Sequence, residues 1–177
     1  MAIQEKSKTR FIITRSFNAP IQMVWKALTE VPYLQNWWGT RSSSWVTGSV
    51  ELRPGGEFKY CLRSGGGLAR KGKWVYEEIA APNWMAFTRF NSNLDEELSL
   101  HPVSENWPNE LKCEVKLTES NGGTTLVWAS SPINASEKQI NEFESSHDSM
   151  LEGFTALFNK LESFLESLIE KEHASQG

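Results

Sequence analysis

The sequence has little that would support secretion, membrane insertion or a disulfide framework. It contains two cysteines, Cys61 and Cys113, and neither has a CxxC or histidine partner nearby. Lone cysteines on predicted strands are typical of small buried side chains in a reducing compartment, so no disulfide is expected. The first residues lack the apolar segment of a signal peptide, and no apolar run approaches the ~18 residues of a membrane helix. These absences predict a cytoplasmic protein with no membrane span.

Basic residues and histidines are also sparse. The formal net charge is −4, and lysine and arginine are dispersed along the chain. Nucleic-acid binding needs a concentrated basic surface, so no nucleic-acid partner is expected. The three histidines, His101, His147 and His173, have no histidine four residues away that would form a helical ligand pair. We therefore expect no metal site and no cofactor.

Tryptophan, in contrast, is abundant. Eight tryptophans are spread over nearly every predicted element of the 177-residue chain. They either fill a common core, which is the ordinary role of buried aromatic side chains, or line a shared pocket. They are Trp25, Trp37, Trp38, Trp45, Trp74, Trp84, Trp107 and Trp128.

The first part of the chain predicts a strand followed by two short helices. Phe11 to Phe17 is rich in β-branched and aromatic residues, which favours a strand. Pro20 is suited to a first helical turn, and Pro32 is expected to end that helix. Residues 33–37 then predict a second short helical turn. The apolar stripe of the first helix is Ile21, Val24, Trp25 and Leu28.

From residue 45 the pattern changes to short strands separated by turns. Alternation of apolar and charged residues predicts an antiparallel sheet that is wet on one face. The predicted strands are Trp45–Leu52, Glu57–Ser64, Leu68–Ile79, Trp84–Phe90, Leu111–Leu117 and Thr124–Ala129. The stretch from Asn91 to Glu110 has no clear periodicity and is long for a connection, which predicts a functional flap or a mobile loop.

The C-terminal part predicts one long amphipathic helix. Ser136 to Gln139 fits a capping box, and the helix is expected from Glu137 to about Ile169, before a polar tail over residues 170–177. Its wide apolar face carries four phenylalanines, which suits packing on a sheet better than a coiled coil. We expect one domain over residues 1–177 with an ordered core at about 10–169.

Several motifs in order resemble one superfamily. Residues 17–20 with 24–29, Trp37-Trp38-Gly39 and residues 52–58 are similar to the START-like (SRPBCC) superfamily. Within it they resemble the branch named for the activator of heat-shock-protein-90 ATPase, over about residues 10–168. The resemblance implies an α+β helix-grip fold: a curved six- or seven-stranded antiparallel sheet, two short helices after the first strand, and a long C-terminal helix on the concave face.

The leading functional hypothesis is a non-catalytic binding module for a small hydrophobic or amphipathic molecule, held between sheet and helix. Such pockets are mostly apolar with few polar anchors, which Tyr60 and a tryptophan N–H can supply. The candidate lining residues lie opposite charged strand positions or on the apolar face of the helix. They are Trp38, Phe58, Tyr60, Trp74, Trp128, Met150, Phe154, Leu157 and Phe158.

Two other hypotheses remain open. The resemblance implies a co-chaperone or stress-response factor with a heat-shock chaperone ATPase as its partner. A cavity enzyme of cyclase or hydrolase type would use His147 or His101 as acid or base. The sequence does not predict an oligomeric state.

Overall fold

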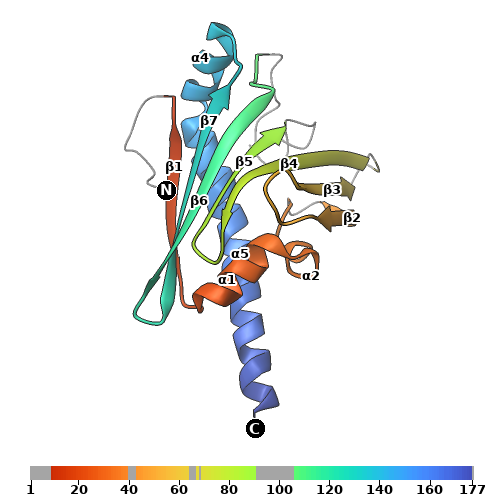
Figure 1. Cartoon of the computed structure of the whole chain (residues 1–177), viewed down its shortest axis with the longest axis vertical. Helices are drawn as coiled ribbons and strands as arrows, with labels where there is room; N and C mark the ends of the chain where they lie inside the picture. The colour runs from red at the N-terminus through yellow and green to blue at the C-terminus, as the bar shows by residue number, and fades with distance from the viewer. Residues whose placement is uncertain (1–8, 40–42, 64–66, 68, 91–105, 177) are drawn as a thin grey trace.

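A computed structural model describes residues 9–39, 43–63, 67, 69–90 and 106–176. Seven strands form one sheet in the order β1-β7-β6-β5-β4-β3-β2, and all neighbours are antiparallel (Figure 1). The strands are β1 Phe11–Phe17, β2 Ser44–Val50, β3 Glu57–Arg63, β4 Ala69–Ala80, β5 Trp84–Phe90, β6 Glu110–Ser120 and β7 Gly123–Ile133. The predicted α+β helix-grip fold is confirmed.

The strands form where the sequence alternates between apolar and polar residues. In β6 the side chains of Leu111, Cys113, Val115 and Leu117 are buried, while Lys116 between the last two is exposed. One face of the sheet is therefore apolar and must be covered.

Two short helices follow β1, as predicted, but Pro32 has another role than expected. Helix α1 (Ile21–Thr29) starts directly after Pro20 and already ends before Glu30. Pro32 lies in the first turn of α2 (Val31–Leu34), where its missing N–H needs no partner.

The predicted C-terminal helix is in fact two helices. Helix α4 (Glu137–Ser145) starts with the predicted capping box, in which Ser136 and Gln139 bond reciprocally. The chain breaks at Ser146, and α5 then runs from His147 to Ser175. The prediction of one uninterrupted helix was thus wrong, and helix extends through most of the predicted polar tail.

Helix α5 crosses one face of the curved sheet and its last turns project past α1 and α2 (Figure 1). Its buried side chains include Met150, Phe154, Phe158 and Leu161. A polar contact adds to this apolar packing: Arg15 on β1 donates to Glu162 at 2.6 Å and to Asn159 at 2.7 Å. The core therefore lies between the sheet and α5. In the described part of the chain, no helix is long and apolar enough to cross a membrane.

The predicted flap falls mainly outside the described residues, which resume at Asn106. The next two residues, Trp107 and Pro108, are buried. Trp107 packs against Phe143 of α4, with ring centroids 5.7 Å apart. The end of this stretch thus joins the core before β6 begins at Glu110.

Candidate functional site

The nine predicted lining side chains lie in the interior between the sheet and α5. Three elements of the sheet supply Phe58 and Tyr60 (β3), Trp74 (β4) and Trp128 (β7). The segment after α2 supplies Trp38, and α5 supplies Met150, Phe154, Leu157 and Phe158. All nine are between 0% and 8% exposed.

Their aromatic rings are in contact with one another. The ring centroid of Trp38 lies 5.1 Å from that of Trp74 and 5.8 Å from that of Tyr60, both edge to face. Trp128 lies 5.4 Å from Phe154 and 6.3 Å from Phe158 of α5. These spacings are those of packed aromatic pairs, so the rings join the sheet directly to the helix.

A polar group stands in the middle of these rings. Burial raises the pKa of the Tyr60 hydroxyl, while the Arg89 charge and the indole N–H groups of Trp38 and Trp74 act in the opposite direction. All three groups must therefore lie near the Tyr60 oxygen. We call Trp38, Tyr60, Trp74 and Arg89 the interior polar cluster.

The N–H groups of Trp38 and Trp74 have no hydrogen-bond acceptor among the described residues. Both stabilise the ionised form of Tyr60 through their proximity, but neither reaches its oxygen with hydrogen-bond geometry. Buried N–H groups are nearly always paired, so two unpaired donors side by side require an explanation.

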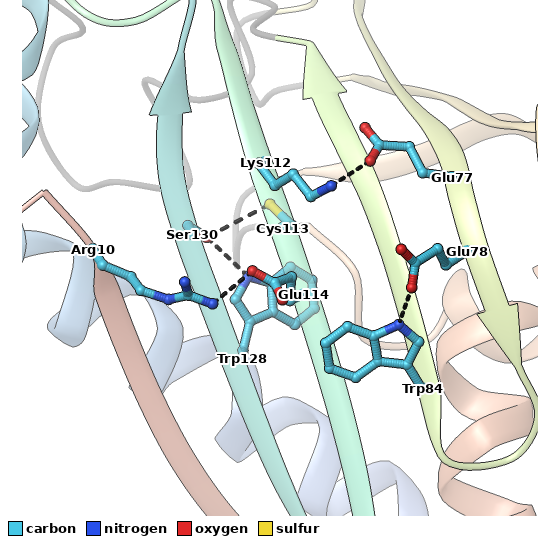
Figure 2. Close-up of polar contacts among 9 residues, drawn as sticks. All are labelled: Arg10, Glu77, Glu78, Trp84, Lys112, Cys113, Glu114, Trp128 and Ser130. Carbon is cyan, nitrogen blue, oxygen red and sulfur yellow. Dashed lines mark hydrogen bonds and ion pairs between the residues drawn. The ribbon is translucent and has the colours of Figure 1, made fainter. Parts of the chain in front are cut away.

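Three other tryptophans of the same chain donate to acceptors. Figure 2 shows Trp128 Nε1 donating to Ser130 Oγ at 3.1 Å and Trp84 Nε1 donating to Glu78 at 3.0 Å. Trp37 Nε1 donates to the carbonyl of Ala27 at 2.8 Å. The fold can thus supply acceptors to buried indoles. Trp107 Nε1 is also buried without a partner among the described residues, but it packs against Phe143 of α4, whereas Trp38 and Trp74 lie together with ring centroids 5.1 Å apart.

Arg89 is the residue that sequence reasoning missed. It lies opposite Trp74 of β4 and Leu111 of β6 in the sheet register, is 5% exposed, and its guanidinium carbon lies 5.8 Å from the Trp38 ring centre. Met85, Phe87 and Arg89 are alternate residues of β5 and so face the same side of the sheet. A single charged residue in this otherwise apolar set was the sequence signal that could have identified Arg89. A charged side chain so deeply buried is rare unless an interaction stabilises it.

Charged side chains on the opposite face of the sheet behave differently. Lys112 of β6 pairs with Glu77 of β4 across the intervening β5, and Arg10, just before β1, pairs with Glu114 of β6 at 2.6 Å across β7 (Figure 2). The side chains of both pairs remain partly exposed. These pairs are ordinary surface ion pairs, which contribute little to stability.

Gly72 makes room for the polar cluster. It faces Tyr60 across the β3–β4 pair, and a Cβ built on it would lie 2.2 Å from Tyr60 Cζ. The Tyr60 ring therefore lies directly on the backbone of β4, and any larger residue at this position would displace it.

Hollows bordered by the described residues occur outside the packed aromatic interior. One of about 420 Å³ lies over β2, β3 and β4 and is lined by Lys59, Lys71 and Lys73 with part of Tyr60. Another, of about 470 Å³, lies between α1, α2 and the end of α5, beside Met23, Tyr33 and Leu168.

The histidines and cysteines give no sign of reactive chemistry in the described residues. His147 packs edge-on against Phe11 and Phe143, at ring-centroid distances of 5.7 Å and 5.2 Å, and burial lowers its pKa. His147 is half-buried against these aromatic rings, and this packing role argues against His147 as a catalytic residue. His101 lies outside the described residues. No group of potential metal ligands occurs in the part that the structure describes.

Both cysteines are free and buried, as expected. Burial raises the pKa of Cys113 to about 11. Its sulfur lies 3.5 Å from Ser130 Oγ (Figure 2). The neutral thiol therefore behaves as a small core residue.

The fold and its aromatic interior define a protein of the START-like helix-grip class. Residues 18–166 match the family model described as "Activator of Hsp90 ATPase homolog 1-like protein", and the chain belongs to this family. No curated protein matches the chain.

Solved structures share the fold at low sequence identity. A protein from Rhodobacter sphaeroides superposes with a TM-score of 0.75 at 18% identity, covering 94% of this chain and 99% of that chain. A protein from Nitrosomonas europaea gives 0.72 at 19% identity, with the same coverage. A protein from Arthrobacter aurescens gives 0.71 at 22% identity, covering 92% and 90%. These similarities show the fold alone.

Proposed function

We propose that this protein binds a small amphipathic molecule in its interior, between the sheet and α5. The observation that carries the proposal is the pair of buried, unpaired N–H groups of Trp38 and Trp74. Leaving a buried donor without an acceptor costs about 1–3 kcal/mol. An acceptor group on a bound molecule would relieve this penalty for both tryptophans.

The surroundings match the apolar part of such a molecule. Trp74 stacks on Phe87 with centroids 4.1 Å apart, and Phe58 and Trp128 complete the wall. A few polar anchors within an aromatic wall are characteristic of small-molecule sites. Because the rings are in contact, a ligand must separate them on entry. We therefore expect association to be slower than the ~10⁵ M⁻¹s⁻¹ at the low end of typical protein association rates.

Calorimetric titration with two shapes of probe tests the proposal. The probes are 2-naphthoate with 2-naphthamide, and decanoate with decanamide, so that flat and flexible apolar bodies each carry two head groups. We expect at least one probe to bind and Trp38→Phe to weaken that binding. Trp84→Phe, which removes an indole on the opposite face, serves as the matched control and should bind as the wild type does. If no probe binds at millimolar concentration, the proposal is wrong.

A second candidate function is action on a heat-shock chaperone, and the family description favours it. Its test is the ATPase rate of Hsp90 with and without this chain. A concentration-dependent increase would support the co-chaperone role, and an unchanged rate would count against it.

A further inference from the structure

The hollow of about 420 Å³ over β2, β3 and β4 lies on the outer face of the sheet. Lys59 of β3 stands between the buried residues Phe58 and Tyr60, so its side chain faces away from the interior. Lys73 precedes the buried Trp74 of β4 in the same way. The hollow is therefore separated from the aromatic interior by the sheet itself. Its lysines are Lys59, Lys71 and Lys73.

Short side chains form the floor of this hollow. Thr47 of β2 lies opposite Cys61 of β3 in the sheet register, and Cys61 lies opposite Lys71 of β4. One row further along, Ser49 lies opposite Lys59. Because the short residues stand between long lysines on one face, the surface is depressed there and the ammonium groups surround the depression.

The charges around the hollow are not balanced. Lys59 and Lys73 lie directly opposite each other, and like charges in such a cross-strand pair are destabilising. Among the described residues, Glu57 is the one carboxylate within ion-pair distance of the three lysines, at 3.0 Å from Lys59 and 3.9 Å from Lys73. Three lysines and one carboxylate leave two positive charges, in a chain whose formal net charge is −4. A concave surface lined by one sign of charge attracts ions of the other sign.

We propose that this hollow binds the phosphate group of a small organic phosphate. A phosphate monoester carries about −1.5 to −2 charge at pH 7 and three strong acceptor oxygens, which matches the charge of the hollow. Lysine binds phosphate as a point charge, and the exposed hydroxyls of Thr47 and Ser49 can donate to further oxygens.

The organic part of the ligand has a surface to lie on. The ring of Phe90 lines the hollow, is only half-buried, and has Lys73 Nζ 4.7 Å from its centroid. A volume of about 420 Å³ is in the range of small-molecule sites. Because this site and the proposed interior site lie on opposite faces of the sheet, the inference does not depend on the proposed function.

Calorimetric titration with phenyl phosphate and phenyl sulfate tests this inference. The two probes share the aromatic body, but phenyl sulfate carries a single negative charge. The titration uses low ionic strength because salt screens exposed charges. At pH 7 we expect phenyl phosphate to bind about fivefold more tightly than phenyl sulfate. Equal affinities would overturn the assignment to phosphate, and no binding of phenyl phosphate at millimolar concentration would overturn the site. Binding to phosphatidate-containing vesicles without binding of phenyl phosphate would overturn it in favour of a membrane surface.

Variants locate the binding. Lys71→Gln should weaken binding of phenyl phosphate about fivefold, whereas Lys71→Arg, which keeps the charge, should bind nearly as the wild type does. Lys116→Gln is the matched control, because it removes the same charge from an exposed position of β6 outside the hollow and should leave the affinity unchanged. Equal weakening by Lys71→Gln and Lys116→Gln would mean that net charge alone attracts the probe, and the site would be refuted. Ser49→Glu places a carboxylate at an exposed position of the hollow and should abolish binding; if phenyl phosphate still binds this variant as tightly as the wild type, the inference is overturned.

Discussion

Gly72→Ala should destabilise this protein, although the same substitution normally stabilises a strand. At a compatible position, Gly→Ala contributes about 0.4–1 kcal/mol of stability by restricting the unfolded chain. Here the new Cβ would lie 2.2 Å from Tyr60 Cζ and 2.3 Å from its hydroxyl oxygen. Ordinary carbon contacts need about 3.5–4.0 Å, so the ring must move by more than an ångström.

The ring has little freedom to move. Its centroid lies 4.8 Å from that of Phe58 and 5.8 Å from that of Trp38, and the side chain is 3% exposed. Overpacking of this kind typically costs about 1–3 kcal/mol. After subtraction of the entropic gain, we expect Gly72→Ala to lose about 1–2 kcal/mol in free energy of unfolding. Urea unfolding followed by circular dichroism measures this loss.

A double-mutant cycle identifies the cause. In a Tyr60→Ala background the clash is absent, so Gly72→Ala should be neutral or stabilise by up to about 1 kcal/mol. If Gly72→Ala destabilises both backgrounds equally, the contact with Tyr60 is not responsible and the account of Gly72 is refuted.

Three further predictions concern the helices. Phe158→Ala should cost about 3–5 kcal/mol because the side chain is fully buried, whereas Leu151→Ala, at a position 47% exposed on α5, should change stability by less than about 0.5 kcal/mol in urea unfolding. Ser136→Ala removes the capping bond to the Gln139 amide and should cost about 1 kcal/mol, and a loss below about 0.3 kcal/mol would contradict the role of this cap. Burial lowers the pKa of His147 in the folded protein, so the unfolded chain takes up the proton first as the pH falls. The contribution of His147 to stability should therefore be complete above pH ~6.5 and decline as the pH falls below that value. His147→Gln should remove this pH dependence.

The strand pattern could be predicted from the sequence because alternation encodes burial directly. Phe11–Phe17 and Trp84–Phe90 coincide with β1 and β5, and Ser136 marks the start of α4. The break at Ser146 could not be predicted in this way, because the apolar spacing from Phe143 through His147 to Met150 continues across it. A periodic pattern records which side faces the core and does not show where the backbone changes direction.

The candidate site was only partly predictable for a related reason. The aromatic lining could be predicted because alternate residues of a strand face the same side of the sheet. In β5 both sets of alternate residues are apolar, so the sequence does not show which set faces the interior. Arg89 was therefore not recognised as an interior residue. All seven residues of β5 are at least partly buried, including Thr88 on the opposite face. Whether a buried indole finds an acceptor depends on neighbours from distant strands. Trp128 meets Ser130 and Trp74 meets no acceptor among the described residues, although the two residues look alike in sequence.

This difference between Trp74 and Trp128 allows the stability of the fold to be separated from its binding role. Both side chains are fully buried, and replacing either with phenylalanine removes the same ring volume and one N–H. Trp128→Phe breaks the bond to Ser130, whereas Trp74→Phe removes a donor that the folded protein leaves unpaired. We expect Trp128→Phe to cost about 2 kcal/mol more in free energy of unfolding. Trp74→Phe, in turn, should weaken binding of the 2-naphthoate or decanoate probe more than Trp128→Phe does. Equal losses of stability would mean that the Trp74 N–H is satisfied in the folded protein, and the main support for an acceptor-bearing ligand would be gone.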